Sequence, residues 1–219
     1  MPVPRFCETL LLILLTALPI GATAAETLPP AIGVSEPMAK PVKGDDGLFH
    51  QPWFNESFLD LREDFKEAKA AGKRFAVVFE QRGCIYCTKM HNEVLARAYI
   101  NNYVRGNFAL LQLNMWGSRE VTDFDGKQMP EKKLAERWGV MFTPTVVFFK
   151  DEIDGLDAKW GQPLEVTRMS LGVGPGTFFD LFVWVRHKIY EKDRNFQRFH
   201  LQRYDERKKL TEAKVGGAQ

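Results

Sequence analysis

The alternation of apolar and polar positions divides the middle of the chain into helices and strands. An amphipathic helix is predicted from Asn55, placed to cap it, to Gly72, placed to end it. Its apolar stripe recurs at helical spacing and consists of Phe58, Leu61, Phe65 and Ala68. Short apolar runs at residues 75–79, 108–113 and 146–149 are typical of buried strands, and residues 165–171 are suited to pair with the last of these.

Further helices and one hairpin are predicted between and after these strands. A helix follows Cys84, with Cys87, Met90, His91, Val94 and Ala98 on one stripe. Residues 121–127 form a hairpin that turns at Asp125-Gly126, and a helix runs from Pro130 to Trp138, where Gly139 stops it. The last core helix has Phe178, Phe182, Val185 and Ile189 on one face. The order predicts an α/β fold, a mixed central sheet covered by helices on both faces.

The two ends of the chain differ from this core. Arg5, the apolar run from Leu10 to Ile20 and the small residues Ala22-Thr23-Ala24 match a secretory signal peptide, residues 1–24, cleaved near Ala24. An uncleaved anchor is less favoured, because the run is shorter than the roughly 20 residues that span a bilayer. Residues 25–53 are rich in Pro, Gly and charge and predict a flexible linker. The folded domain then covers residues 54–190.

The remainder, residues 191–219, is dense in charge but carries scattered aromatic and apolar residues. We expect a charged C-terminal helical extension that rests partly on the domain. The alternative is a docking arm for a partner. The formal net charge of +2 is too small to favour a nucleic-acid partner.

The cysteines carry the candidate chemistry. Cys7 precedes the apolar run and leaves with the signal peptide, so the mature chain keeps only Cys84 and Cys87. A disulfide between them closes a very short loop and stabilises the fold little, which favours cycling between dithiol and disulfide. Cys84 lies where a strand gives way to a helix, whose N–H groups stabilise a thiolate. We therefore expect Cys84 to be the nucleophile and Cys87, one turn into the helix, to be the resolving cysteine.

A metal site is the alternative use of the same residues. His91 follows Cys87 by four positions, so Cys84, Cys87 and His91 lie close enough to be zinc ligands. A fourth ligand is not evident in the sequence, and we expect no metal, with His91 packed behind the cysteines. Asp123 and Asp125 contain only a fragment of a calcium loop, and turn chemistry explains them better.

Three segments together resemble the thioredoxin superfamily. They are Phe79–Cys87, Met90-His91 and the segment Trp138–Thr145, which contains Thr143-Pro144. The similarity extends to SoxW-type periplasmic thioredoxins through the Phe79-Glu80-Gln81 entry and the segment Val121–Gly126. The resemblance covers residues 54–190 and implies a thioredoxin-like fold. It also implies that Pro144 is cis beside the sulfurs and that Thr143 pairs with a substrate strand.

Other positions depart from the family pattern. Ile85-Tyr86 replaces the Gly-Pro of thioredoxin between the cysteines, and Ile85 and Tyr86 are candidate substrate contacts. Tyr86 and Trp116 either border the substrate groove or are ordinary surface aromatics. Val78 occupies the position of the buried Asp that serves proton transfer in thioredoxin. Glu80 has the same strand parity and is a candidate proton acceptor for Cys87; the alternative is a partly solvated carboxylate at the strand end.

The sequence thus predicts an exported thiol-disulfide oxidoreductase. We expect a periplasmic reductase of protein disulfides, with no cofactor beyond the redox-active Cys84–Cys87 pair. Its expected partners are protein substrates with disulfides or thiols and, by the SoxW resemblance, a membrane electron donor of the DsbD/CcdA type. We expect a monomer. The alternatives are a Dsb-like oxidant or isomerase with the same site and, less favoured, a non-catalytic adaptor or chaperone module.

Overall fold

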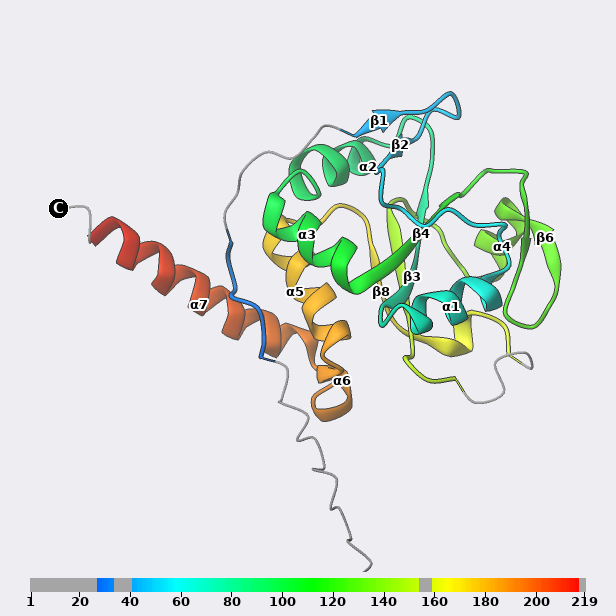
Figure 1. The fold of residues 1–219 in the computed structure, drawn as a ribbon. Coiled ribbons are helices and arrows are strands. Elements are labelled where there is room, and N and C mark those ends of the chain that lie inside the picture. Colours follow the sequence, from blue (N-terminus) through cyan, green and yellow to red (C-terminus); the bar gives the residue numbers. More distant parts are fainter. Residues whose placement is uncertain (1–26, 34–40, 154–158, 217–219) are drawn as a thin grey trace, which may run out of the picture.

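The computed structural model describes residues 27–33, 41–153 and 159–216 (Figure 1). The predicted signal peptide and its cleavage position lie outside the described residues. Within the described ranges, no helix is both long enough and apolar enough to cross a membrane.

A four-stranded mixed sheet forms the centre of the molecule. Its order is β4 (Phe108–Asn114), β3 (Arg74–Glu80), β7 (Thr145–Phe149) and β8 (Glu165–Ser170). β3 and β4 are parallel, whereas β3 with β7 and β7 with β8 are antiparallel. All four strands coincide with the predicted apolar runs to within one or two residues, and the predicted mixed sheet is confirmed.

Helices cover both faces of this sheet. α1 (Leu61–Ala70) and α4 (Glu131–Arg137) lie on one side, and α3 (Ala98–Asn107) and α5 (Pro175–Arg186) on the other (Figure 1). Side chains of a strand alternate between its faces. Accordingly Phe75, Val77 and Phe79 of β3 pack in the core with α1 and α4, while Ala76 and Val78 pack in the core with α3 and α5.

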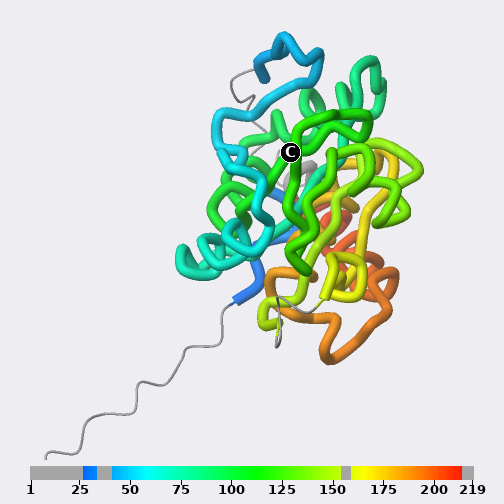
Figure 2. Tube along the Cα trace, turned by 90° about the vertical axis from the view of Figure 1, so that its right-hand side faces the viewer, coloured from blue at the N-terminus to red at the C-terminus, as the bar shows by residue number. Residues whose placement is uncertain are grey.

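Two small hairpins form separate two-stranded sheets. β5 (Glu120–Thr122) and β6 (Gln128–Pro130) form the hairpin predicted from Asp125-Gly126, where Gly126 has a φ of 80°. β1 (Val42–Lys43) pairs with β2 (Phe49–His50) inside the segment expected to be a flexible linker. That expectation is wrong for residues 41–53, because Leu48 and Gln51 are buried against distant parts of the chain. In Figures 1 and 2 this hairpin and α6 (Ile189–Lys192) lie at opposite ends of the molecule.

The first helix begins later than predicted. α1 is capped by Asp60, whose side chain accepts a hydrogen bond from the backbone N–H of Arg62. Asn55 instead donates to Asp64, and Phe58 is fully exposed. Leu59 has a positive φ of 64°, which no continuous helix allows. The apolar spacing that includes Phe58 therefore overstated the length of the helix.

The helix after Cys84 is interrupted. α2 (Ile85–Lys89) continues into a π-helical turn, η1 (Met90–Val94), and α3 starts afresh at Ala98. The N–H of Leu95 donates to the carbonyl of Met90, a bond that spans one residue more than in an α-helix. Met90, His91 and Val94 remain buried, as the predicted stripe requires, but Ala98 is only half-buried and begins α3, so the predicted continuous helix is wrong.

The C-terminal part packs on α5. Lys188 has a positive φ of 51°, which breaks the helix after α5. Ile189 therefore belongs to α6 rather than to the predicted core helix. A short 3₁₀ turn, η3 (Gln162–Leu164), precedes β8, and α7 (Phe196–Gly216) follows α6. Phe199 and Arg203 of α7 are buried, and the last turns of α7 extend away from the body (Figure 1).

Candidate functional site

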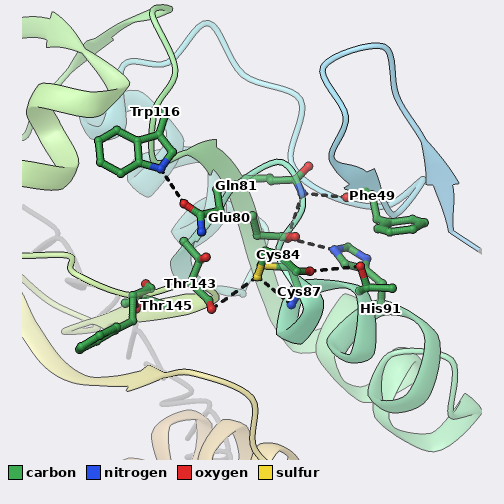
Figure 3. The surroundings of a disulfide bond; sticks show 12 residues. Phe49, Glu80, Gln81, Cys84, Cys87, His91, Trp116, Thr143 and Thr145 are labelled. Carbon is green, nitrogen blue, oxygen red and sulfur yellow. Dashed lines mark hydrogen bonds and ion pairs between the residues drawn. A yellow bond between two sulfur atoms is a disulfide. The ribbon is translucent and has the colours of Figure 1, made fainter.

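Cys84 and Cys87 are joined in a disulfide at the end of β3 that leads into α2 (Figure 3). Gly83 takes a φ of 76° to turn the chain out of the sheet, and Cys84 then occupies the N-cap position of α2. Its sulfur accepts a hydrogen bond from the backbone N–H of Cys87 at 2.9 Å. When the disulfide is reduced, this N–H donor also stabilises a thiolate at Cys84. Cys84 retains 8% exposure and Cys87 3%, so Cys84 is the more accessible of the two.

Thr143 and Pro144 face this disulfide from the start of β7. The Thr143–Pro144 peptide bond is cis. The carbonyl oxygen of Thr143 lies 3.4 Å from the sulfur of Cys84, as Figure 3 shows. The structure thus brings together four residues from two segments far apart in the sequence.

Exposed apolar side chains surround the pair. Large hydrophobic residues that are well exposed include Ile85 and Tyr86 of α2, Met141 and Phe142 before Pro144, and Leu171 after β8. A groove of about 210 Å³ runs between Tyr86, Pro144 and Leu171. Exposed apolar surface gathered in one place is typical of a binding surface. Ile85 and Tyr86 are both exposed at the start of α2, and their role as substrate contacts stays a prediction.

Trp116, in the loop after β4, also lies beside the site. Its ring is largely exposed, and its indole N–H donates to the side-chain oxygen of Gln81 at 2.6 Å (Figure 3). Gln81 belongs to the loop that leads to Cys84. Trp116 is therefore held against the loop that leads to Cys84, and its exposed ring is available to a partner molecule.

Glu80 is fully buried and is not a solvated strand-end carboxylate. Its Oε1 accepts hydrogen bonds from His91 Nε2 and from Gln112 Nε2, each at 2.9 Å. Its Oε2 has no hydrogen-bond partner within the described part of the chain. Glu80 and Cys87 line the same small cavity, of about 50 Å³. The carboxylate of Glu80 therefore has one oxygen without a hydrogen-bond partner among the described residues, and Glu80 lines the cavity that the resolving cysteine also borders.

His91 packs behind the disulfide with both ring nitrogens engaged. Nε2 contacts Glu80, and Nδ1 lies 3.2 Å from the side-chain nitrogen of Gln51. The rings of Phe49 and Phe54 flank the imidazole at centroid distances of 5.9 and 5.7 Å. Among the described residues, no group of three or more His, Cys, Asp or Glu side chains is arranged to hold a metal ion.

The segment Val121–Gly126 is a structural hairpin. Both carboxylate oxygens of Asp123 accept hydrogen bonds, from Arg137, Trp138 and backbone N–H groups. Burial raises the pKa of the Asp123 carboxyl, whereas the hydrogen bonds from Arg137 lower the pKa of the Asp125 carboxyl. These contacts fix the hairpin against α4 and use the oxygens that a cation would need.

Sequence reasoning missed Gln51, Gln112 and the β1–β2 hairpin. Gln112 gave a usable signal, because it is a polar residue inside an otherwise apolar strand. Gln51 gave no such signal, because its partner His91 is 40 positions away. Gln51 also lies in a segment whose composition predicts a linker.

Comparison with known proteins agrees with this geometry. Residues 61–156 match the family model described as a thioredoxin-like domain. No curated protein matches the chain. Among solved structures, the chain is similar to a thioredoxin-fold protein from Helicobacter pylori, with 17% identity, a TM-score of 0.49, and coverage of 61% of this chain and 86% of that one.

Two more solved structures are similar. A thioredoxin from Thermus thermophilus has 23% identity and a TM-score of 0.42, with coverage of 56% of this chain and 81% of that one. DsbH oxidoreductase has 16% identity and a TM-score of 0.41, with coverage of 67% of this chain and 95% of that one. With TM-scores below 0.5, these likenesses add no argument to the fold described above.

Proposed function

We propose that this chain, a thiol-disulfide oxidoreductase of the thioredoxin superfamily, works as an exported reductase of protein disulfides. The observation that carries the proposal is the placement of Cys84, at the start of α2 and 3.4 Å from the carbonyl oxygen of Thr143. The nucleophile is thus held beside a backbone segment suited to bind an extended substrate.

The reaction follows from the positions of the two sulfurs. The Cys84 thiolate attacks one sulfur of a substrate disulfide, forms a mixed disulfide and releases the other substrate sulfur as a thiolate. Cys87 then gives its proton to Glu80 and attacks the Cys84 sulfur. The Cys84–Cys87 bond forms, the bond to the substrate breaks, and the substrate leaves with both of its sulfurs reduced. Two electrons pass from the protein to its substrate.

The substrate binds along the apolar surface beside the disulfide. The backbone at Thr143 offers hydrogen bonds to an extended segment, and Ile85, Tyr86 and Phe142 offer apolar contact. A protein that exposes a disulfide in an extended, apolar segment is therefore the preferred substrate class. We expect the enzyme to act as a monomer.

The cellular setting of the proposal rests on the sequence. The signal peptide predicted at residues 1–24 supports export to the periplasm. There the oxidised enzyme is recharged by a membrane electron donor of the DsbD/CcdA type, as the resemblance to SoxW-type thioredoxins implies.

The reduction potential of Cys84 and Cys87 tests the direction of the reaction. Equilibration of the mature protein with thiol-disulfide buffers is expected to give a value near that of thioredoxin, roughly −270 mV. A value towards about −120 mV would instead identify an oxidant or isomerase of the Dsb kind.

Cysteine variants test the assigned roles. Cys84→Ser is expected to abolish reduction of a model protein disulfide. Cys87→Ser is expected to accumulate a mixed disulfide at Cys84, which mass spectrometry of the trapped complex detects. Wild-type turnover by Cys84→Ser would refute the assignment of the nucleophile.

A further inference from the structure

The β1–β2 hairpin covers the inner side of the active site. Lys43, Gly47, Leu48 and Phe49 of this hairpin line the cavity that Glu80 and Cys87 also border. Leu48 is buried, and residue Gln51, directly after the hairpin, reaches His91. The hairpin therefore separates the Glu80 carboxylate from solvent on the side opposite to the substrate surface.

The hairpin is attached to the loop that carries Cys84. Arg82 donates to the carbonyl oxygens of Asp45 and Asp46 at 3.3 and 3.4 Å. Gly47 has a φ of 80°, and a Cβ atom there would lie 2.5 Å from the Arg82 side chain. The positive φ favours glycine at this position, where the chain passes close to the Arg82 side chain. The position of the hairpin is therefore fixed relative to the cysteines.

A chain of hydrogen bonds runs from the hairpin to Glu80. An amide nitrogen only donates, so Gln51 donates to Nδ1 of His91 and the ring proton resides on Nε2. His91 Nε2 then donates to Oε1 of Glu80. Gln112 donates both to Oε1 of Glu80 and to the carbonyl oxygen of Phe49 in β2, at 2.9 and 2.8 Å. Each route ends on the same carboxylate oxygen.

This arrangement distinguishes the two oxygens of Glu80. Oε1 accepts two hydrogen bonds, which occupies both of its lone pairs. Oε2 is buried and has no partner among the described residues. The cavity that Glu80 and Cys87 line, of about 50 Å³, has room for a few water molecules, since one needs about 10–15 Å³ by this measure. A proton that leaves the Cys87 sulfur thus has one carboxylate oxygen ready to accept it.

From this asymmetry we propose that Gln51, His91 and Gln112 are positioning residues for proton transfer between Cys87 and Oε2 of Glu80, and that the β1–β2 hairpin is part of the active site. The inference rests on the proposed function. The proton of the Cys87 thiol passes to Oε2, the Cys87 thiolate attacks Cys84 in the mixed disulfide, and the substrate thiolate leaves. The segment that supplies Gln51 lies outside the residues 61–156 that match the thioredoxin-like family model.

A chromogenic aryl disulfide separates the two steps in the reduced mature protein, which keeps only the Cys84 and Cys87 thiols. Attack by Cys84 releases one coloured thiolate and leaves an aryl mixed disulfide. Attack by Cys87 then forms the Cys84–Cys87 bond and releases the second. Stopped-flow absorbance measures the rate of each phase. The first phase reports the nucleophile, and the second reports the resolving step with its proton transfer.

Gln51→Ala is expected to slow the second phase about tenfold and to leave the first unchanged, since a positioned base contributes roughly 10²-fold or more. Gln128→Ala is the matched control. Gln128 is the same residue type and is exposed in β6, in the other hairpin. Its variant is expected to keep both rates. Equal slowing of both phases, or no slowing of the second, in Gln51→Ala would overturn the inference.

His91 provides the second test. His91→Leu is expected to slow the second phase, and His91→Gln to restore much of the rate, because the amide nitrogen of Gln reaches about as far as Nε2 and also donates. A merely structural role predicts no such rescue, so equal rates in the two variants count against the proposal. If the wild-type protein releases no coloured thiolate, the proposed function itself fails, and that result is distinct from a failure of the inference.

Discussion

Asp64, in the first turn of α1, is a buried carboxyl group whose charge the fold tolerates poorly. Its oxygens accept hydrogen bonds from Asn55 and Ser57 at 3.1 and 2.6 Å. Burial nevertheless raises the pKa of Asp64 from 3.8 to about 6. The folded state binds the proton more tightly than the unfolded state, so the contribution of this group to stability is full below pH 3.8 and is lost as the pH rises through about 6.

Asp64→Asn removes this titration. Relative to the wild-type protein, the variant is expected to gain stability as the pH rises from about 4 to 7, because its side chain has no charge to bury. Urea unfolding at several pH values measures the difference in unfolding free energy. A difference that is constant across that range would show that Asp64 does not titrate as its burial implies.

Single residues of the site differed in how far the sequence could predict them. Short sequence motifs indicate the chemical roles of Cys84, Cys87 and Pro144. Glu80 was proposed from strand parity, but its burial depends on a hairpin that has no local signal. His91 gave an ambiguous signal, because its spacing from Cys87 suits a metal ligand as well as a packed ring. The contacts of its two ring nitrogens with Glu80 and Gln51 identify the packed ring.

At the scale of elements, apolar periodicity located the helices and strands but not their ends. The helix after Cys84 illustrates the reason. Its buried stripe is the same whether the helix is continuous or contains the π turn of Met90–Val94, so the pattern cannot reveal the extra residue. The start of α1 depends likewise on Asp60 and the backbone at Leu59 rather than on apolar spacing.

α7 is joined to the domain by a buried charge cluster. Asp180 of α5 is fully buried. Its carboxylate forms ion pairs with His200, Arg203 and Arg207 of α7. Burying a carboxylate is costly unless it is paired, so α7 and α5 stabilise each other. The first half of the charged extension is therefore structural, whereas the exposed residues from Lys208 to Ala213 contribute little.

Two truncations separate the halves of this extension. Ending the chain at Tyr190 is expected to lower the unfolding free energy by about 3–5 kcal/mol, the usual cost of breaking a buried ion pair. Ending it at Lys209 keeps the cluster and is expected to cost less than about 0.5 kcal/mol. Denaturant unfolding measures both. Similar stabilities for the two truncations would exclude a structural role for the cluster.

At the scale of the whole molecule, two additions flank the thioredoxin-like core. The β1–β2 hairpin lies at one end and completes the surroundings of Glu80, whereas α7 packs on α5 and supports the fold (Figure 1). The overall order of strands and helices was predictable because it is encoded in local periodicity. The roles of the additions were not, since each depends on contacts between residues far apart in the sequence.

A double-variant cycle tests this separation. Gln51→Ala and Arg203→Leu share no partner, so their effects on the unfolding free energy are expected to add within about 0.5 kcal/mol. Arg203→Leu is also expected to leave both phases of thiolate release unchanged. A larger coupling, or a slower resolving step in Arg203→Leu, would mean that α7 acts on the active site.

Arg203 also bonds to the carbonyl oxygens of Pro29 and Pro30, at 2.6 and 3.2 Å. Prolines have no N–H to offer a sheet, so this segment takes its place through a side chain more than 170 positions later in the chain. Loss of the Arg203 guanidinium would therefore leave the Pro29 and Pro30 carbonyl oxygens, as well as Asp180, without this side-chain donor.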